Sequence, residues 1–577
     1  MKKTGAWLTV YALEQLPVKY TFGIPGVHNT EIYDELGKSK KINPILVTHE
    51  GGGAFMADAI SRTSSEIGVL VTVPAAGITH AMSGIGEAYL DGIPMLVLSG
   101  GIRRDTGNRY QLHELDQVKL LAGITKKAYV IQRHNEIIPT IFEAYKEAIS
   151  GEPGPVFIEI PVNIQLFEGE VGNINAYKPE AKLKLSVDPI KIKEATEMLM
   201  KANNPGMFLG WGCCDATESA VMIAELLQAP VATTLQGLSV FPGNHPLHTG
   251  MGFSKAAVPA AENAFKNCDC LLAVGTRFAE IPTGSFGAKV PKNLIHVDIN
   301  RNVFHKNYPA KIVIEGDAKD VLEDILKEIQ KKEPKKNGKL LQDQIARDKK
   351  NYKSEWKSHN TKSKVNPLHF FDSLRTNLSD DVITVVDDGN HTFLFAELFT
   401  NLKPRHYISP TDFNCMGYCV PAVIGAKLAN PEKQVVGVVG DGAFLMTCME
   451  ILTASVHKLG VVYFVFNDGE LSQISQGQEI PYNRKTCTIL GNVNILGIAE
   501  ATNSAYKEIN NNKDLENIIP EALQISANGQ PVIVNVNIDY SKRTRFTSGV
   551  VKTVLGKFPM EDKIRFVGRA VKRKITG

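Results

Sequence analysis

Acidic and amide side chains follow two apolar runs within one segment, residues 435–479. Gly440-Asp441-Gly442 comes directly after VVGVV, and Asn467-Asp468 comes directly after VVYFVF. Apolar runs of this length are typical of buried parallel strands. A glycine turn that opens a helix presents free backbone N–H groups and the positive end of the helix dipole, which bind phosphate groups. The pattern predicts a diphosphate site at Gly440, Asp441, Gly442 and Ala443.

The same turn offers ligands for a divalent cation. A bound diphosphate usually needs such a cation, and Mg²⁺ prefers oxygen ligands in an octahedron. Asp441 supplies one carboxylate, and Asn467 or Asp468 supplies a further oxygen from the end of the neighbouring strand. Either motif alone is common in turns and at strand ends. The prediction therefore depends on both motifs lying in one strand–helix–strand unit.

Two loops near the N-terminus carry ionisable side chains in the same strand–loop–helix setting. His28 lies in TFGIPGVHNTEIYDEL, and Glu50 lies in PILVTHEGGGAFMADAISR, where the glycines permit close approach of another chain segment. Ligands bind at the carboxyl ends of strands in parallel sheets. A single glutamate or histidine there can equally be a helix cap or a solvated loop residue.

Apolar strands alternate with helical patterns along the whole chain, which predicts an α/β protein. We expect three doubly wound parallel-sheet domains, at residues 1–180, 185–335 and 360–545, followed by a tail at 546–577. The polar stretch KKEPKKNGK, residues 331–339, marks the boundary before the third domain.

The composition favours a globular protein in a reducing compartment. Of the 577 residues, 43% are hydrophobic and 22% are charged, and no apolar run is long enough for a membrane helix. The eight cysteines lack paired CxxC spacing and are expected to be free thiols, and no signal peptide is expected. We therefore expect a cytoplasmic protein. The net positive charge lies in the tail, while the rest of the chain is net acidic, which argues against a nucleic-acid partner.

To about residue 540 the chain resembles the thiamine diphosphate-dependent 2-oxo acid decarboxylase and carboligase family, which includes acetolactate synthase. The resemblance implies that Asp441, Asp468 (27 residues further on) and the carbonyl of Glu470 bind Mg²⁺. It also implies that Asn467 and Gln473 lie at the cofactor. The family carries Asn where this chain has Asp468, so this ligand is a departure.

The same resemblance gives roles to residues elsewhere in the chain. THEGGGAFMADAISR makes Glu50 the carboxyl that hydrogen-bonds the aminopyrimidine ring and promotes the tautomer that activates the cofactor; a buried carboxyl with raised proton affinity suits that task. DFNCMGYCVPAVIGAKLANP makes Met416 the apolar wedge that bends the cofactor, with the backbone near Asn414 facing the ring. Core packing is the alternative role for Met416.

Several departures from acetolactate synthases bear on the substrate. Gln473 and Gly477 stand where those enzymes bring a Met and a Trp to the substrate. His28 stands in PGVH, where those enzymes have PGG and benzaldehyde lyase also carries a histidine. The run RRDTGNRYQLHELDQ, with Gln111 and His113, is closer to 5-guanidino-2-oxopentanoate decarboxylase. We interpret His28, Gln111 and His113 as catalytic or site-lining candidates.

The resemblance implies decarboxylation of a 2-oxo acid, with pyruvate as the favoured donor, and transfer of the acyl unit to a second carbonyl. Plain decarboxylation of another 2-oxo acid is one alternative, and an FAD-dependent enzyme like pyruvate oxidase is another. A non-catalytic cofactor-binding protein is the alternative outside enzymes. In the family the activating glutamate and the diphosphate site come from different subunits, which implies a homodimer or a homotetramer.

The tail has a different character from the body. Residues 541–577 hold 11 Lys and Arg against Glu561 and Asp562, and Ile564, Val567, Val571 and Ile575 recur at helical spacing. Such a basic amphipathic helix can lie on an anionic membrane surface, cover the active site or stay solvated.

Overall fold

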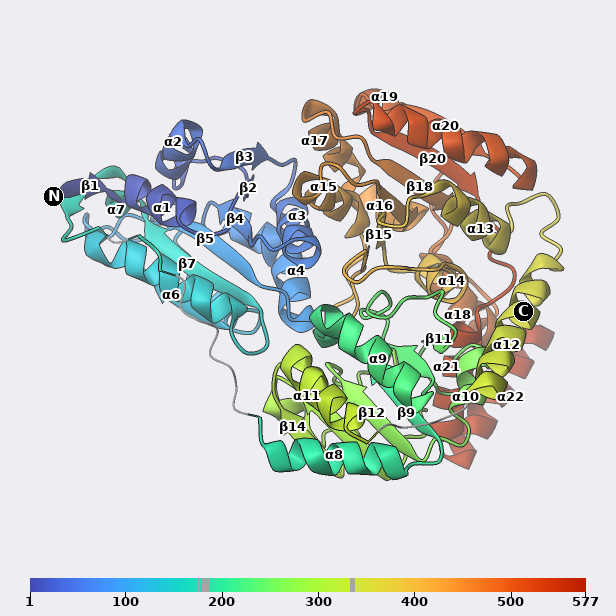
Figure 1. Cartoon of the computed structure of the whole chain (residues 1–577). Coiled ribbons are helices and arrows are strands. Elements are labelled where there is room, and N and C mark those ends of the chain that lie inside the picture. The colour runs from blue at the N-terminus through green and yellow to red at the C-terminus, as the bar shows by residue number, and fades with distance from the viewer. Residues whose placement is uncertain (175, 179–186, 333–337, 577) are drawn as a thin grey trace.

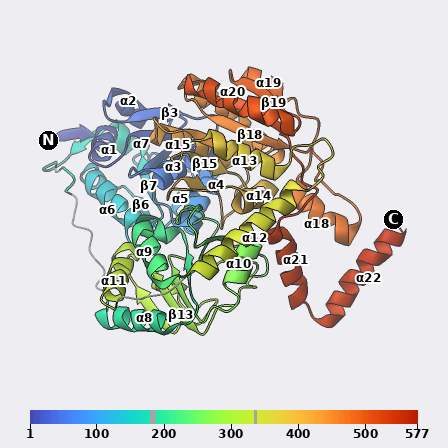
Figure 2. The same cartoon turned by 45° about the vertical axis from the view of Figure 1, so that its right-hand side comes forward.

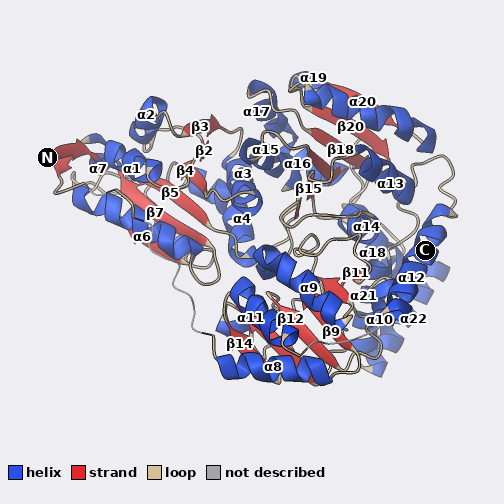
Figure 3. Cartoon of the chain, in the orientation of Figure 1, coloured by secondary structure: helices blue, strands red, loops and turns tan. Residues whose placement is uncertain are grey.

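Three parallel sheets, each of six strands, form the framework of the protein (Figures 1 and 3). The structure is a computed structural model that describes residues 1–174, 176–178, 187–332 and 338–576. Helices lie on both faces of the sheets, so the predicted α/β class with three doubly wound domains is confirmed. The expected boundaries at 180, 185 and 335, and part of the polar stretch 331–339, lie outside the described residues.

The N-terminal sheet has the strand order β3-β2-β4-β5-β7-β6. Its central strands are apolar on both faces because helices cover both sides. A short antiparallel pair, β1 (Lys2–Thr4) with β8 (Glu168–Glu170), closes the domain. The strands are β2 (Tyr20–Gly23), β3 (Asn43–Leu46), β4 (Gly68–Thr72), β5 (Met95–Gly101), β6 (Lys127–Val130) and β7 (Pro155–Pro161). The helices are α1 (Gly5–Glu14), α2 (Thr30–Lys38), α3 (Glu50–Thr63), α4 (Ala76–Asp91), α5 (Gln117–Leu121), α6 (Ile137–Ile149) and α7 (Val162–Leu166).

The central sheet has the order β11-β10-β9-β12-β13-β14. The strands are β9 (Pro205–Leu209), β10 (Val231–Thr233), β11 (His248–Met251), β12 (Cys270–Val274), β13 (Asn293–Asp298) and β14 (Ile312–Glu315). The helices are α8 (Pro189–Lys201), α9 (Thr217–Leu227), α10 (Pro259–Ala264) and α11 (Ala318–Gln330), and α12 (Lys339–Lys357) leads to the third domain.

The C-terminal sheet has the order β16-β15-β17-β18-β20-β19, so the two strands predicted to carry the diphosphate and metal site are neighbours. The strands are β15 (Ile383–Val386), β16 (Tyr407–Ile408), β17 (Val435–Gly440), β18 (Val462–Asn467), β19 (Ala505–Ile509) and β20 (Val532–Asn537). The helices are α13 (Pro367–Asn377), α14 (Asn390–Leu398), α15 (Cys419–Ala429), α16 (Asp441–Thr447), α17 (Ile451–Val456), α18 (Ser472–Tyr482), α19 (Ile495–Ala501) and α20 (Leu515–Ala527).

The N-terminal and C-terminal domains share one continuous apolar core. Helices α3 and α15 pack against each other at its centre. A Cβ at Gly425 would lie 2.3 Å from the backbone oxygen of Met56, so glycine is needed for this close helix crossing. Packing of this kind fixes the two domains relative to each other.

The tail forms two helices, α21 (Arg545–Lys557) and α22 (Met560–Thr576), which project from the body in Figure 2. The predicted apolar stripe of Ile564, Val567, Val571 and Ile575 lies on α22, and all four side chains are exposed. Helix α21 packs on the body, where Phe546 stacks on Phe393 and Lys557 donates to the carbonyl of Ser285. Helix α22 contacts the end of α18, where Arg573 donates to the carbonyl of Pro481 and Asn483 donates to the carbonyl of Arg573. Within the described residues, none of the helices is long and apolar enough to span a membrane.

Candidate active site

The Gly440-Asp441-Gly442 turn joins β17 to the first turn of α16. Because β17 and β18 pair in parallel, Gly440 lies opposite Phe466, and the two predicted motifs meet at the same edge of the sheet. The carboxylate of Asp441 accepts hydrogen bonds from the backbone N–H groups of Asp468, at 3.2 Å, and Gly469, at 2.7 Å. The structure thus brings together residues that are 27 positions apart, as the spacing predicted.

Two carboxyl groups face this turn. Burial raises the pKa of Asp441, and burial together with the charges of Asp441 and Glu470 raises the pKa of Asp468 to about 6. Ser472 donates a hydrogen bond to Asp468. In the described part of the chain no three His, Cys, Asp or Glu side chains form a ready metal cluster. The predicted set contains only two carboxylates and a carbonyl, which fits Mg²⁺ completed by diphosphate and water oxygens.

Glu470 contributes no side chain to the predicted metal position. Its carboxylate pairs with Lys485 at 2.7 Å and accepts from Ser475, and its backbone bridges to Ile489. Asn467 donates to the side chain of Asn535 at 3.1 Å. Asp468 stays the predicted metal ligand.

A histidine that sequence reasoning missed lies against the predicted diphosphate turn. The side chain of His391, in the first turn of α14, lies against Gly440, where a Cβ would come within 3.0 Å of the ring. Burial lowers the pKa of His391 to about 3, so the ring is neutral, and its Nε2 is buried with no hydrogen-bond partner among the described residues. The ring lies beside the start of α16 as well as in the first turn of α14, so it borders the predicted diphosphate turn. The signal was present in DDGNH, another glycine turn between a buried strand and a helix.

The loop that precedes α15 carries Met416 and Asn414. Asn414 and Gly417 both have positive φ, +66° and +84°, so the loop follows a strained path through the left-handed region. Asp387 holds its end, accepting from the backbone N–H groups of Gly417 at 3.0 Å and Cys419 at 2.7 Å. Met416 is half-buried against the core shared by the two domains. This position is compatible with both a wedge role and a packing role.

Glu50 is the first residue of α3 and is buried. The side chain of His49 caps the helix by accepting from the N–H of Gly51. Nδ1 of His80, in α4, lies 3.0 Å from Oε2 of Glu50, and the rings of His49 and His80 stack at 4.6 Å. The sequence analysis did not identify His80. Glu50 therefore has a half-exposed hydrogen-bonding partner from the neighbouring helix.

Two of the candidates predicted from the N-terminal loops, His28 and His113, lie in contact with each other. Their Nδ1 atoms are 3.2 Å apart, and burial together with the nearby His113 lowers the pKa of His28. Gln111 instead donates to the carbonyls of Arg103 and Asn108, within its own loop. The structure thus joins the two histidines and leaves Gln111 as a residue that shapes the loop.

Helix α18, immediately after the metal-ligand candidates, carries Gln473 and Gly477. The Oε1 atom of Gln473 is buried without a partner among the described residues, and space around Gly477 is open. An unpaired amide oxygen next to the diphosphate turn is consistent with a site-lining position.

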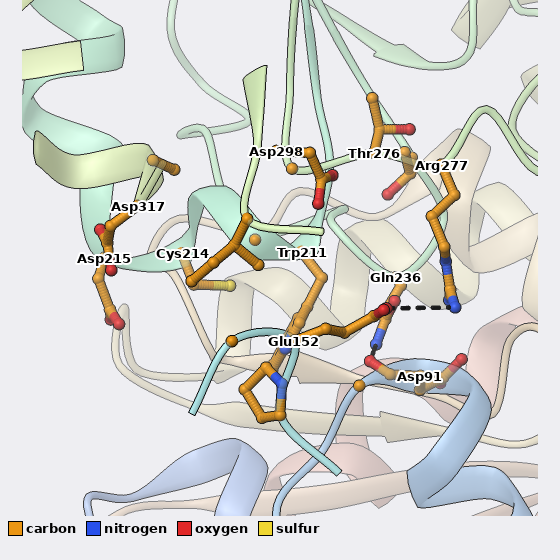
Figure 4. Close-up of a pocket in the computed structure, with 18 of the residues that line it drawn as sticks. Asp91, Glu152, Trp211, Cys214, Asp215, Gln236, Thr276, Arg277, Asp298 and Asp317 are labelled. Carbon is orange, nitrogen blue, oxygen red and sulfur yellow. Dashed lines mark hydrogen bonds and ion pairs between the residues drawn. The ribbon is translucent and has the colours of Figure 1, made fainter. Parts of the chain in front are cut away.

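A separate cavity of about 950 Å³ opens at the carboxyl ends of the central strands. In Figure 4, Asp298, Thr276 and Arg277 lie across from Asp91 and Glu152 of the N-terminal domain. Carboxylates outnumber cations in the lining by eight to four, and Arg277 is already paired with Glu152 at 3.5 Å. The lining therefore suits the hydroxyl groups of a dinucleotide better than its diphosphate, and FAD remains a prediction.

Comparisons with known proteins cover all three domains. Residues 3–120 match the thiamine pyrophosphate enzyme N-terminal TPP binding domain, and residues 192–325 match the central domain of these enzymes. Residues 387–536 match their C-terminal TPP binding domain. Thiamine pyrophosphate (TPP) is the cofactor also called thiamine diphosphate. These matches include the Gly440-Asp441-Gly442 turn and the Glu50 helix.

Similar proteins extend this match to nearly the full length. The chain is 32% identical to a probable acetolactate synthase large subunit of Methanocaldococcus jannaschii, over 93% of this chain and 92% of that protein. It is 31% identical to the acetolactate synthase large subunit of Buchnera aphidicola subsp. Acyrthosiphon pisum, over 93% and 95%. It is 29% identical to the isozyme 3 large subunit of Escherichia coli, again over 93% and 95%. The chain therefore belongs to the thiamine pyrophosphate enzyme family and is similar throughout to acetolactate synthase large subunits.

Proposed function

We propose that this enzyme decarboxylates a 2-oxo acid, with pyruvate as the donor, and transfers the acyl unit to a second carbonyl compound. The observation that carries the proposal is the full-length similarity to acetolactate synthase large subunits together with a buried Glu50 at the start of α3. When bound, thiamine diphosphate supplies the nucleophilic carbon and the electron sink for loss of CO₂.

The residues of this chain would bind and orient that cofactor. Asp441, Asp468 and the carbonyl of Glu470 would hold Mg²⁺, while the N–H groups at the start of α16 and His391 would bind the diphosphate. Glu50 would accept and return a proton at the aminopyrimidine ring, with His80 holding its carboxylate.

His28 and His113 would move a proton at the reacting carbonyl. Two ring nitrogens 3.2 Å apart can share one proton, and the positive charge of one ring disfavours protonation of the other. A neutral His28 can therefore accept a proton near neutral pH. The pair also supports the rival function, plain decarboxylation, because an aldehyde product requires a proton donor at this position.

Product analysis separates these two functions. Purified protein with thiamine diphosphate, Mg²⁺ and pyruvate should form acetolactate, scored as acetoin after acid treatment. Acetaldehyde as the main product would establish plain decarboxylation instead. Neither product from pyruvate would contradict the assignment of the donor. Glu50→Gln should lose turnover while keeping cofactor binding.

An oxidase that uses FAD is the second candidate. The volume of the cavity, about 950 Å³, suits a large ligand, although its acidic lining suits the hydroxyl groups of a dinucleotide better than its diphosphate. A yellow protein that reduces an electron acceptor during pyruvate turnover would support this function. A colourless protein that turns over pyruvate would contradict it.

We propose further that two copies of the chain form the working unit. Leu445, Met446 and Met449 lie exposed on and just after the short helix that begins with Asp441, where a monomer would leave apolar side chains in water. A mixture of Glu50→Gln and Asp441→Ala subunits tests this arrangement. If each cofactor lies between two subunits, half of the statistically mixed dimers regain one intact site, and about a quarter of native activity returns. No recovery after mixing would contradict a shared site.

A further inference from the structure

Two loops of the candidate site are held by buried carboxylates of the opposite domain. The first loop is Thr48-His49, which leads into Glu50 in the N-terminal domain. The second is the loop 411–417, which carries Met416 in the C-terminal domain. We propose that Glu450 and Glu87 are positioning residues that hold these two loops across the interface between the domains.

Glu450 lies at the start of α17 in the C-terminal domain and reaches the N-terminal loop. Its carboxylate accepts from the N–H of Thr48 at 3.1 Å and from the hydroxyl of Thr48 at 2.7 Å. Thr453 donates a further hydrogen bond at 2.7 Å, which fixes the carboxylate from its own side. A Cβ at Gly52 would lie 2.5 Å from Oε2 of Glu450, so this glycine in α3 admits the carboxylate.

Glu87, on α4 of the N-terminal domain, makes the reciprocal contact. Its two carboxylate oxygens accept from the N–H groups of Thr411 and Cys415, each at 3.1 Å. A Cβ at Gly86 would lie 2.5 Å from the ring of Phe413, so here too a glycine admits the loop of the other domain. The two contacts span 324 and 328 positions of the chain and are therefore tertiary restraints rather than local turns.

Both carboxylates are buried in the structure, 2% exposed for Glu450 and fully buried for Glu87. Burial raises the pKa of both groups. Thr453 donates a hydrogen bond to Glu450, and the guanidinium of Arg62 lies 4.0 Å from Glu87. A buried carboxylate that accepts two backbone N–H groups restrains a loop more firmly than a neutral side chain would.

The consequence concerns the geometry of the site. Glu50 directly follows the loop held by Glu450, and Met416 directly follows Cys415, which is held by Glu87. Asp91 also accepts from the hydroxyl of Thr411 at 2.7 Å, so loss of Glu87 loosens its loop mainly at the Cys415 side, while loss of Glu450 loosens the loop before Glu50. The inference deepens the proposed function, because it rests on the roles proposed there for Glu50 and Met416.

Hydrogen–deuterium exchange of the full-length protein without cofactor tests the restraints directly. Glu450→Gln should raise exchange of the Thr48 amide, and Glu87→Gln that of the Thr411 and Cys415 amides, each by about 10- to 100-fold, the range expected for a hydrogen bond to a charged group. Glu450→Gln should leave the exchange rates of the Thr411 and Cys415 amides unchanged, and Glu87→Gln should leave that of the Thr48 amide unchanged. Native exchange at these amides in both variants would overturn the proposal.

Glu397→Gln is the matched control. Glu397 is a partly buried carboxylate that accepts two backbone N–H groups, from Arg545 at 3.2 Å and Phe546 at 2.8 Å, but it holds α21 rather than a cofactor loop. It should raise exchange only near residue 545. Glu450→Asp and Glu87→Asp, which keep the charge and shorten the reach, replace the glutamine variants if those fail to fold.

Cofactor affinity then links the restraints to the site. Calorimetry should give a dissociation constant for thiamine diphosphate at least 10-fold higher for Glu450→Gln and Glu87→Gln than for Glu397→Gln. An equal affinity in all three would overturn the link to the cofactor. If exchange rises as expected while Glu50→Gln and Met416→Ala keep native turnover, the proposed roles of those two residues fail and the restraints stand.

Discussion

Arg62 connects the two cofactor-binding domains through a fully buried ionic cluster. Its guanidinium donates to Asp58 at 2.7 and 3.2 Å and to Asp91 at 2.9 Å, and Glu87 lies 4.0 Å away. Arg62 and these three carboxylic side chains are all completely buried or nearly so. We predict that Arg62→Met strongly destabilises the protein, because three buried carboxylates then lose their only cation in this cluster.

The expected loss follows from the burial. Removing one partner of a buried ion pair costs about 3–5 kcal/mol, since the remaining charge stays desolvated and uncompensated. Burial already raises the pKa of Asp58 and Glu87, and loss of Arg62 raises it further. Carboxyls whose folded-state pKa lies above the unfolded value stabilise the fold at low pH and lose this contribution as pH rises through the folded value. The deficit of Arg62→Met should therefore be largest at neutral pH and shrink as pH falls toward about 4, near the unfolded values.

Arg405→Met is the matched control for this change. Arg405 lies over the same Trp211 ring as Arg62, at 5.5 Å against 5.9 Å, but pairs with Asp215, whose side chain is 69% exposed. An exposed pair of this kind contributes about 0–1 kcal/mol. Urea unfolding followed by tryptophan fluorescence, with Trp211 as the local reporter, measures both variants over pH 4–8. Equal stability of the two variants at pH 7, or a deficit of Arg62→Met that grows on acidification, would refute the reasoning.

Four further predictions concern the site and the tail. Asp441→Ala should abolish Mg²⁺-dependent binding of thiamine diphosphate in calorimetry, as EDTA should in the native protein; retained affinity would contradict the metal assignment. His391→Ala should weaken the binding of thiamine diphosphate by about 10-fold and leave the binding of thiamine, which lacks the diphosphate, unchanged. His113→Ala removes a charge that lowers the pKa of His28, so the acid limb of the kcat/KM profile should move to higher pH; an unmoved limb would show that His28 is not the titrating group. Deletion of residues 560–576 should abolish flotation with anionic vesicles, and a full-length protein that fails to float would contradict membrane contact.

The diphosphate turn could be predicted from sequence because its signal is local. A buried strand, a glycine turn and a helix follow one another, and the pairing of β17 with β18 then brings Asp468 to Asp441. The alternation of strands and helices gave the α/β class for the same reason. His391 also follows a buried strand and a glycine turn. Its turn reads Asp-Asp-Gly rather than Gly-Asp-Gly, so the motif did not point to it.

Contacts between distant segments could not be predicted in this way. His80 lies on the helix of a third strand–loop–helix unit. It reaches Glu50 only because α3 and α4 pack side by side. Glu450 lies more than 400 positions from Thr48. No periodicity within a window of residues carries such information, since the contact depends on how two complete domains pack.

Helix α3 carries both kinds of function at its two ends. Its first residue is Glu50, and its last two turns present Asp58 and Arg62 to the other domain, where Tyr418 donates to Asp58 at 2.6 Å. Packing at the domain interface therefore fixes the helix that begins with Glu50. Glu87 and Glu450 add hydrogen bonds to the opposite domain. Exchange of a whole domain between relatives therefore requires that the partners of Glu87 and Glu450 be exchanged with it.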